Sequence, residues 1–247
     1  MSNTIGRVVW RECMTKDVNK AKGFYGELFG WKFDEMKMEG MTYNMIKAGD
    51  NAIGGLMALP ADVPAPPHFA SYVSVKDVDA AANAAKANGG QVLHGPMDVP
   101  NMGRFAILAD SDMAVIAAWK SAQGDGEMPE RPGLHTFCWE TLSTKDVAKS
   151  KAFYAAVFGW KTESGPGGAE VFTAEAGLQV ADIQKAEGMP PNWLTYVVIE
   201  KLEAARDKAE KLGAKVLMPL IDVPQVGRIA VIADNQGAVL GLFEPGM

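Results

Sequence analysis

Cysteine is scarce in this chain of 247 residues, which contains only Cys13 and Cys138. Neither lies in a CxxC pair or beside an obvious activating neighbour, so the pattern does not indicate a disulfide framework. Two unmatched thiols fit a reducing cytoplasm. We expect each of them to be a buried structural thiol.

Excess positive charge, long apolar runs and a secretory leader are missing too. The net charge of −6 argues against nucleic acid, which attracts basic surfaces. No apolar run approaches the roughly 20 residues that a membrane helix needs, and the first seven residues lack a basic cluster followed by an apolar core. We therefore expect a cytoplasmic protein with neither a nucleic-acid nor a membrane partner.

An internal repeat is the strongest positive feature of the sequence. The stretch FYGELFGWK at 24–32 returns as FYAAVFGWK at 153–161, and DVPNMGRFA at 98–106 returns as DVPQVGRIA at 222–230. A repeat of this kind indicates that one domain is written twice. The composition, 48% hydrophobic and 22% charged, is that of a globular protein.

Each copy contains two rounds of the same alternation, strand-helix-strand-strand-strand. In the first copy, residues 8–14 predict a strand, and apolar groups at helical spacing predict a helix over 17–29 that ends at Gly30. The remaining elements expected in the first copy are strands at 31–33, 43–46, 52–58, 69–75, 91–93, 104–109 and 114–119 and a helix at 77–88. Equivalent helices are expected at 146–158 and 202–212.

These elements predict an α+β fold of four βαβββ modules that form curved mixed sheets. Residues 1–121 are expected to be the first domain, 122–133 a linker rich in Gly, Pro and charge, and 134–247 the second domain. A module covers one face of its sheet with a helix and leaves the other face bare. Pairing two modules then leaves a concave surface that suits a ligand.

The pattern Asp-Val-x-x-x-Lys-x-Phe-Tyr-x-x-x-Phe-Gly-Trp, at 17–31 and 146–160, resembles the opening helix of the vicinal oxygen chelate superfamily. That superfamily covers glyoxalase I, bleomycin-resistance proteins and extradiol dioxygenases. The segments 103–110 and 227–234 are similar to its last hairpin, and the tandem arrangement looks like a bacterial subgroup labelled glyoxalase-like. The resemblance implies the fold for nearly the whole chain. It leaves the function open among lyases, oxygenases, epimerases and drug-binding proteins.

Enzymes of this superfamily hold a divalent metal with His and Glu side chains from the strands of paired modules. By counting from the helices, the corresponding positions fall on Trp10 and Trp139, Ala70 and Leu194, Ala117 and Gly241, and the pairs 54–55 and 180–181. None of these side chains offers the N, O or S donor that a divalent ion requires. We therefore expect neither a metal at the family position nor another cofactor.

The first strand of each copy carries the leading candidates for a ligand site. Trp10 and Glu12 share one strand face, which the resemblance places toward the cavity, and Trp139 and Thr141 are their counterparts. Each Trp either fills the core or stacks on a planar ligand. Glu12 either pairs with an arginine or has a raised pKa and acts as a catalytic base.

Further candidates lie at the expected cavity rim. His68 and Asn192 begin the fifth strand of each copy, and His68 is either an isolated polar residue or a catalytic partner of Glu12. Arg104 and Arg228 occupy the same repeat position. Each either pairs with nearby aspartates, namely Asp98 and Asp110 or Asp222 and Asp234, or binds a ligand carboxylate or phosphate. Met45 belongs to a methionine-rich set that supplies flexible apolar lining.

The sequence thus favours a protein that binds a small organic molecule in a concave sheet without the family metal. The alternatives are a lyase or dioxygenase with a rearranged metal site, such as one using His68 and Glu12, and a metal-free isomerase with Glu12 as base. Because the two copies can mimic a dimer of single domains, we expect a monomer with a pseudo-two-fold axis or a weak homodimer.

Overall fold

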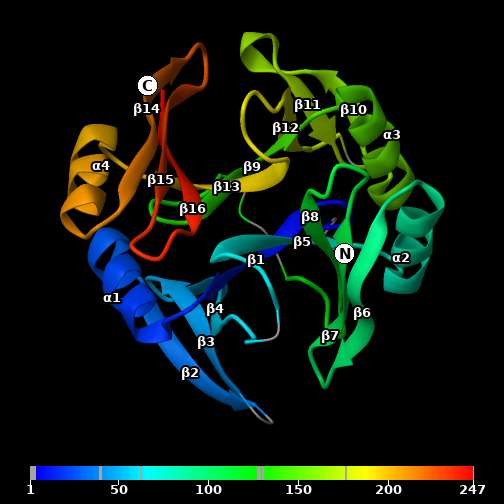
Figure 1. Ribbon diagram of the computed structural model, residues 1–247, viewed down its shortest axis with the longest axis horizontal. Coiled ribbons are helices and arrows are strands. Elements are labelled where there is room, and N and C mark those ends of the chain that lie inside the picture. The colour runs from blue at the N-terminus through cyan, green and yellow to red at the C-terminus, as the bar shows by residue number, and fades with distance from the viewer. Residues whose placement is uncertain are drawn as a thin grey trace. The chain divides into compact units, whose positions relative to one another are not determined.

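The computed structural model describes residues 4–38, 41–61, 63–126, 129, 131–175 and 177–246 (Figure 1). The elements of the first copy are β1 (Val8–Thr15), α1 (Val18–Phe29), β2 (Lys32–Met38), β3 (Met41–Ala48), β4 (Asn51–Ala58), β5 (His68–Ser74), α2 (Val78–Ala87), β6 (Gln91–Val99), β7 (Gly103–Ala109) and β8 (Val115–Ser121). The elements of the second copy are β9 (Phe137–Thr144), α3 (Val147–Phe158), β10 (Lys161–Ser164), β11 (Glu170–Thr173), β12 (Gln179–Lys185), β13 (Asn192–Val198), α4 (Leu202–Lys211), β14 (Lys215–Val223), β15 (Gly227–Ala233) and β16 (Val239–Pro245). A short 3₁₀ turn spans Pro166–Gly168.

Each copy contributes one mixed sheet of eight strands, and the α+β fold of four βαβββ modules is confirmed. The strand order is β2-β3-β4-β1-β5-β8-β7-β6 in one sheet and β10-β11-β12-β9-β13-β16-β15-β14 in the other. The equivalent strands of the two copies therefore occur in the same order in both sheets. The first strand of each module runs parallel to the last strand of that module, and the other pairs within a module are antiparallel.

The helices begin and end at residues that the repeat preserves. Asp17 and Asp146 cap α1 and α3 by accepting a hydrogen bond from the backbone three residues ahead. Both helices end at a glycine in the left-handed conformation, Gly30 with φ 72° and Gly159 with φ 71°, where a side chain would be strained. Among the described residues, no helix is long and apolar enough to cross a membrane.

Several strands extend beyond the expected ranges, because their outer parts carry little hydrophobic signal. Strand β2 continues from Phe33 to Met38 through mostly exposed polar residues, and β6 continues to Val99 through a cis Gly95–Pro96 bond. Such exposed hairpin ends are stabilised by the pairing of their backbones with the neighbouring strand.

The chain forms two compact units, and each unit contains parts of both copies. Unit 1 consists of residues 1–9, 70–130 and 140–193, and unit 2 consists of residues 10–69, 131–139 and 194–247. Helices α2 and α3 pack together in unit 1, and α1 and α4 pack together in unit 2 (Figure 1).

The core of unit 2 combines the aromatic residues of α1 with the strands of the last module. Tyr25, fully buried, donates a hydrogen bond from its hydroxyl to Asp234 Oδ2 at 2.8 Å. Trp31 donates from Nε1 to the carbonyl of His135 at 2.8 Å. Both bonds join residues of different copies, so they hold the two repeats together within this unit.

Unit 1 repeats this arrangement with the roles of the copies exchanged. Tyr154 donates to Asp110 Oδ2 at 3.1 Å, and Trp160 donates from Nε1 to the carbonyl of Gly6 at 2.7 Å. We refer to the two hydroxyl–carboxylate pairs, Tyr25–Asp234 and Tyr154–Asp110, as the Tyr–Asp clasps. Burying each large aromatic side chain in these cores contributes about 1.5–3 kcal/mol.

One expectation about exposure needs correction. Cys13 is buried as expected, but Cys138 is only half-buried, and neither thiol is in a disulfide. The segment expected to be an exposed linker is exposed at nearly all its described residues, and it is anchored at Asp125. Its carboxylate accepts hydrogen bonds from Thr4 Oγ1 at 3.0 Å and from Trp119 Nε1 at 3.1 Å in unit 1.

Substituting Gly23 by Ala is expected to stabilise the protein by about 0.5–1 kcal/mol, because glycine inside a helix costs that much relative to alanine. A Cβ built on Gly23, in the exposed part of α1, meets no described atom within 4 Å. The second copy already has Ala152 at the equivalent position. Urea unfolding should show a gain for Gly23→Ala and a comparable loss for Ala152→Gly; equal stabilities in the three proteins would contradict this.

Candidate functional site

Strands β1, β3 and β4 present two different faces in unit 2. Cys13, Ile46 and Leu56 belong to the buried core that includes the residues of α1. Because successive side chains of a strand point to opposite faces, Trp10, Glu12, Tyr43, Met45 and Gly55 lie on the other face. The expectation that Trp10 and Glu12 share the face opposite the helix agrees with this alternation. We call this surface the Glu12 face.

A chain of hydrogen bonds runs across the Glu12 face. Trp10 donates from Nε1 to the hydroxyl of Tyr43 at 3.0 Å, and Tyr43 donates to Glu12 Oε2 at 3.1 Å. An indole nitrogen can only donate, so the tyrosine hydroxyl must be the acceptor in the first bond, and its own proton is directed to the carboxyl. Tyr43 was not among the residues predicted for the site.

Gly55 makes room for this arrangement. It lies opposite Glu12 in the parallel pairing of β1 with β4 and opposite Met45 in the pairing of β3 with β4. A Cβ at Gly55 would lie 2.0 Å from the Tyr43 hydroxyl and 2.2 Å from Glu12 Oε1. Any side chain at this position would therefore displace the Tyr43–Glu12 pair.

Glu12 is 5% exposed, and within the described part of the chain its Oε1 has no hydrogen-bond partner. Burial raises the pKa of Glu12 to about 8, although hydrogen bonds from Tyr43 and Trp10 partly oppose the increase. The carboxyl is therefore mostly protonated at neutral pH. At that pH it can act as an acid or a hydrogen-bond donor, and it becomes a base only as the pH approaches 8.

The second copy places a different carboxylate at the equivalent point of its sheet. Thr141, the counterpart of Glu12, lies opposite Asp182 in the pairing of β9 with β12 and donates to Asp182 Oδ1 at 2.6 Å. Asp182 is thus the structural counterpart of Gly55. Counting along the sequence had aligned residues 180–181 of the second copy with residues 54–55 of the first. The strand registers instead align residues 181–182 with residues 54–55. The one-residue error concealed Asp182, and the second copy does not lack a titratable group here.

The structure places the other candidates on separate elements. His68, half-buried at the start of β5, has Nδ1 2.8 Å from the carbonyl oxygen of Pro66. Met45 is half-buried on the Glu12 face, and Trp139 is half-buried on β9. Asn192 is the first residue of β13. Their roles in ligand binding stay predictions.

Both candidate arginines are held by two carboxylates each. Arg104 pairs with Asp79 at 2.8 Å and with Asp98 at 3.0 Å. Arg228 pairs with Glu203 and Glu244 at 2.5 and 2.7 Å. Of the four aspartates suggested as partners, Asp98 has this role, whereas Asp110 and Asp234 are the acceptors of the Tyr–Asp clasps. The ion pairs described for Arg228 are with Glu203 and Glu244 and not with Asp222.

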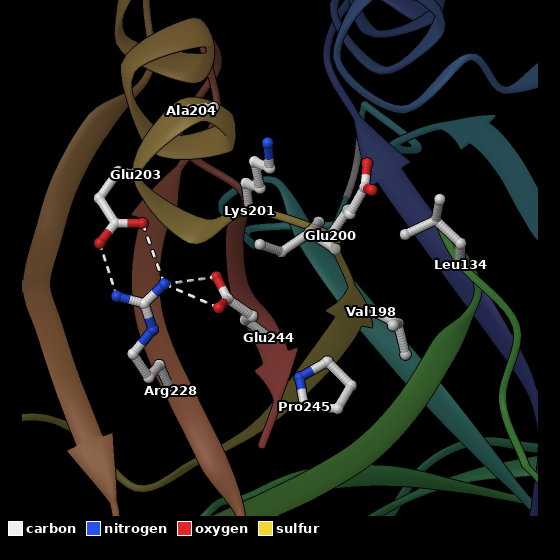
Figure 2. A pocket seen from close by; sticks show the side chains of 10 residues that line it. Leu134, Val198, Glu200, Lys201, Glu203, Ala204, Arg228, Glu244 and Pro245 are labelled. Atoms are coloured by element: carbon white, nitrogen blue, oxygen red, sulfur yellow. Dashed lines mark hydrogen bonds and ion pairs between the residues drawn. The ribbon is translucent and has the colours of Figure 1, made fainter. Parts of the chain in front are cut away.

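A surface groove of about 820 Å³ lies beside Arg228 in unit 2, as Figure 2 shows. Its lining combines apolar side chains such as Leu134, Val198 and Pro245 with the charged Lys201, Glu203, Arg228 and Glu244. The groove does not include the Glu12 face. Three of these charged side chains, Glu203, Arg228 and Glu244, already bond to one another.

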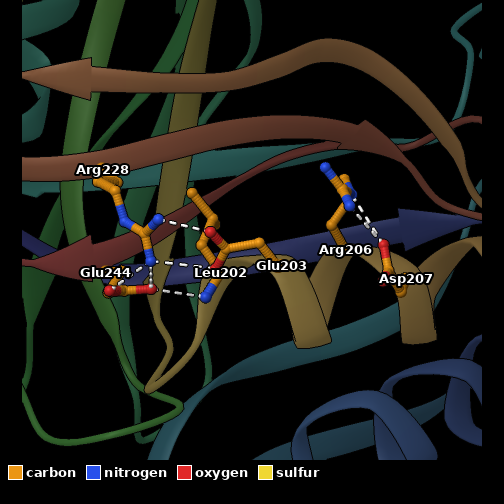
Figure 3. A network of polar contacts seen from close by, with 6 residues as sticks. All are labelled: Leu202, Glu203, Arg206, Asp207, Arg228 and Glu244. Carbon is orange, nitrogen blue, oxygen red and sulfur yellow. Dashed lines mark hydrogen bonds and ion pairs between the residues drawn. The ribbon is translucent and has the colours of Figure 1, made fainter.

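Glu244 also stabilises the start of α4. The N-cap residue of this helix is Lys201, whose side chain makes no capping bond, and Glu244 Oε2 accepts from the backbone of Leu202 at 2.6 Å (Figure 3). The Glu244–Arg228–Glu203 network therefore has a structural role. Arg206 forms a separate pair with Asp207.

Residues 4–117 and 134–242 match the Glyoxalase/Bleomycin resistance protein/Dioxygenase superfamily. The chain belongs to this superfamily. It is 30% identical over 246 residues to the protein named Putative glyoxylase CFP32 of Mycobacterium tuberculosis (strain CDC 1551 / Oshkosh), covering 96% of this chain and 94% of that one. It is 26% identical over 261 residues to the Anthracycline biosynthesis protein DauV of Streptomyces sp. (strain C5), covering 97% and 93%.

Solved structures of the superfamily share the fold. The Mn(II)-bound glyoxalase from Novosphingobium aromaticivorans matches with a TM-score of 0.63 at 12% identity, covering 98% of this chain and 82% of that one. The 2,3-dioxygenase LapB from Pseudomonas sp. KL28 matches with a TM-score of 0.66 at 12% identity, covering 100% and 94%. The resemblance recognised in the sequence is confirmed.

The residues that the resemblance sets at the metal positions do not fit a metal ion, because Asp182 is the only one of them with a donor side chain and it already accepts a hydrogen bond from Thr141. Among the described residues, no three or more His, Cys, Asp and Glu side chains gather closely enough to hold one. At Gly55, the Tyr43 hydroxyl and the Glu12 carboxyl occupy the space of a ligand side chain. At Gly241 the ring of Tyr196 fills this space, 2.1 Å from where a Cβ would lie.

Proposed function

We propose that this superfamily member binds a small organic molecule on the Glu12 face without the family's metal. The observation that carries the proposal is the Oε1 atom of Glu12, a buried carboxyl oxygen without a described partner, on the sheet face that the sequence resemblance places toward the cavity. A buried polar atom left in this way costs about 1–3 kcal/mol, which a ligand hydrogen bond would offset.

The side chains around Glu12 favour a planar, largely apolar ligand. Trp10 and Tyr43 offer aromatic surfaces, and Met45 offers a flexible apolar one; all three are half-buried. The likeness to an anthracycline biosynthesis protein supports the same ligand class, since anthracyclines are planar aromatic molecules.

A metal-free proton-transfer enzyme is the second candidate. A carboxyl whose pKa is about 8 exchanges its proton near physiological pH, as a general acid or base must. If the protein turns over a substrate, Glu12→Gln should lower the rate by about 10²–10⁴ and leave affinity within a few fold. Thr141→Val should have little effect, so equal losses from both substitutions would exclude this role of Glu12.

Binding can be tested by quenching of tryptophan fluorescence with planar aromatic probes, including an anthracycline. We expect saturable binding to the wild-type protein and its loss in Gly55→Val, whose side chain would occupy the space between Tyr43 and Glu12. Gly23→Ala, in which the new Cβ meets no described atom within 4 Å, is the matched control. Equal affinity of Gly55→Val and the wild-type protein would place binding elsewhere.

Metal dependence needs a separate measurement. We expect less than stoichiometric Mn²⁺ or Zn²⁺ after purification without chelator and no effect of EDTA on probe binding. One equivalent of bound metal that Glu12→Gln or Asp182→Asn releases would contradict the metal-free proposal.

A further inference from the structure

We infer that the Glu12 face recognises a hydrogen-bond-accepting oxygen, such as a carbonyl or quinone oxygen, and that Tyr43 is the positioning residue that directs the Glu12 proton toward it. This inference rests on the proposed binding function and specifies its chemistry. The position of the Glu12 proton follows from which oxygen of its carboxyl already accepts a hydrogen bond.

The direction of the hydrogen bonds is fixed at Trp10. Its Nε1 has a hydrogen to donate and no acceptor capacity, so the bond to the Tyr43 hydroxyl runs from Trp10 to Tyr43. The Tyr43 hydroxyl in turn donates its hydrogen to Glu12 Oε2 at 3.1 Å. Oε2 is consequently the carbonyl oxygen of the neutral carboxyl, because it accepts.

The proton of the neutral carboxyl is left on Oε1. This atom is buried, and the described residues offer it no partner. An O–H group in this position lacks an acceptor, so a ligand carbonyl would complete its bonding, whereas a ligand ammonium or amide N–H would not. Burial, which raises the pKa of Glu12, keeps the proton in place at neutral pH.

Gly55 supports the same arrangement from the neighbouring strand. Both the Tyr43 hydroxyl and Glu12 Oε1 approach the point where its Cβ would be, at 2.0 and 2.2 Å. In the second copy the corresponding residues are Asp182 and Thr141, and there the hydroxyl donates to the carboxylate. Among the described residues, the buried carboxyl oxygen that has no partner belongs to the first copy.

The protonation state can be tested without a ligand. At pH 6.5 the infrared spectrum should contain a carboxylic C=O band that is absent in Glu12→Gln. In Tyr43→Phe the band should move to higher wavenumber, because the C=O group loses the hydrogen bond that weakens it. Absence of the band from the wild-type protein, or a band that Tyr43→Phe leaves in place, would overturn the inference.

Ligand recognition can be tested with two probes of the same shape and charge, anthraquinone-2-sulfonate and anthracene-2-sulfonate. We expect the wild-type protein to bind the quinone about tenfold more tightly, which corresponds to one hydrogen bond. Glu12→Leu should lose the preference and keep its affinity for anthracene-2-sulfonate. Tyr43→Phe should reduce the preference, and Thr141→Val should retain it.

The outcomes separate the two proposals. Equal wild-type affinity for both probes would leave small-molecule binding intact and overturn the inference about the acceptor. If neither probe binds, the proposed function fails for planar aromatic ligands, and the inference fails with it. A preference for the quinone that survives in Glu12→Leu would assign the recognition to another residue.

Discussion

Glu12→Gln is expected to make the protein more stable than the wild type at pH 8 and above. The pKa of Glu12 is raised from 4.5 to about 8 by burial, so between these values the folded state holds a proton that the unfolded state has released. The free energy of unfolding of the wild-type protein therefore falls as the pH rises through this window. At about 1.4 kcal/mol per pH unit, the loss is at most about 5 kcal/mol.

Urea unfolding of both proteins at intervals from pH 4.5 to 9 measures this effect. Asp110, whose pKa is also raised by burial, contributes in the same way to both proteins, so the difference between the two curves isolates Glu12. The difference should grow steadily up to about pH 8 and then level off. Parallel curves would show that Glu12 is ionised in the folded protein at neutral pH.

Asp110→Ala and Asp234→Ala should each destabilise the protein by about 3–5 kcal/mol, because several donors lose a shared acceptor. Asp110 accepts hydrogen bonds from the backbone of Asp112 and Ala114 and from the Tyr154 hydroxyl. Asp234 accepts from the backbone of Gln236 and Ala238 and from the Tyr25 hydroxyl. Removal of either carboxylate leaves these groups without a partner in the core.

The same chain offers a control in an exposed aspartate. Asp98 pairs with Arg104 at the surface, and Arg104 keeps Asp79 as a second partner. Asp98→Ala should therefore change stability by less than about 1 kcal/mol. Thermal and urea unfolding of the three variants would show the contrast, and a loss at Asp98 as large as those at the clasps would contradict this assignment.

The four modules could be predicted from the sequence, because the residue patterns that indicate their helices and strands are local. The alternation of apolar residues and the glycines at 30 and 159 predict the helices, and the echo of 24–32 in 153–161 predicts two equivalent sheets. The association of each helix with a helix of the other copy was not predictable in this way. An apolar stripe shows that a face is buried but does not identify its partner.

The candidate site was predictable only in part for a similar reason. Trp10 and Glu12 are two residues apart on one strand, so the period of a strand places them on the same face. Tyr43 reaches Glu12 from another strand of the sheet, and no local pattern connects the two. Asp182 was missed because the register of β12 differs by one residue from the register inferred by counting, and a slip of one residue exchanges the faces of a strand.

Each compact unit draws its residues from both copies, and this has a consequence for how the protein can change over generations. A substitution that alters the fit of Tyr25 is compensated most directly at Asp234, in the other half of the gene. Substitutions in one half of the gene are therefore expected to be accompanied by compensating substitutions in the other half. Recombination that replaces one half with that of a distant relative would mismatch both cores at once.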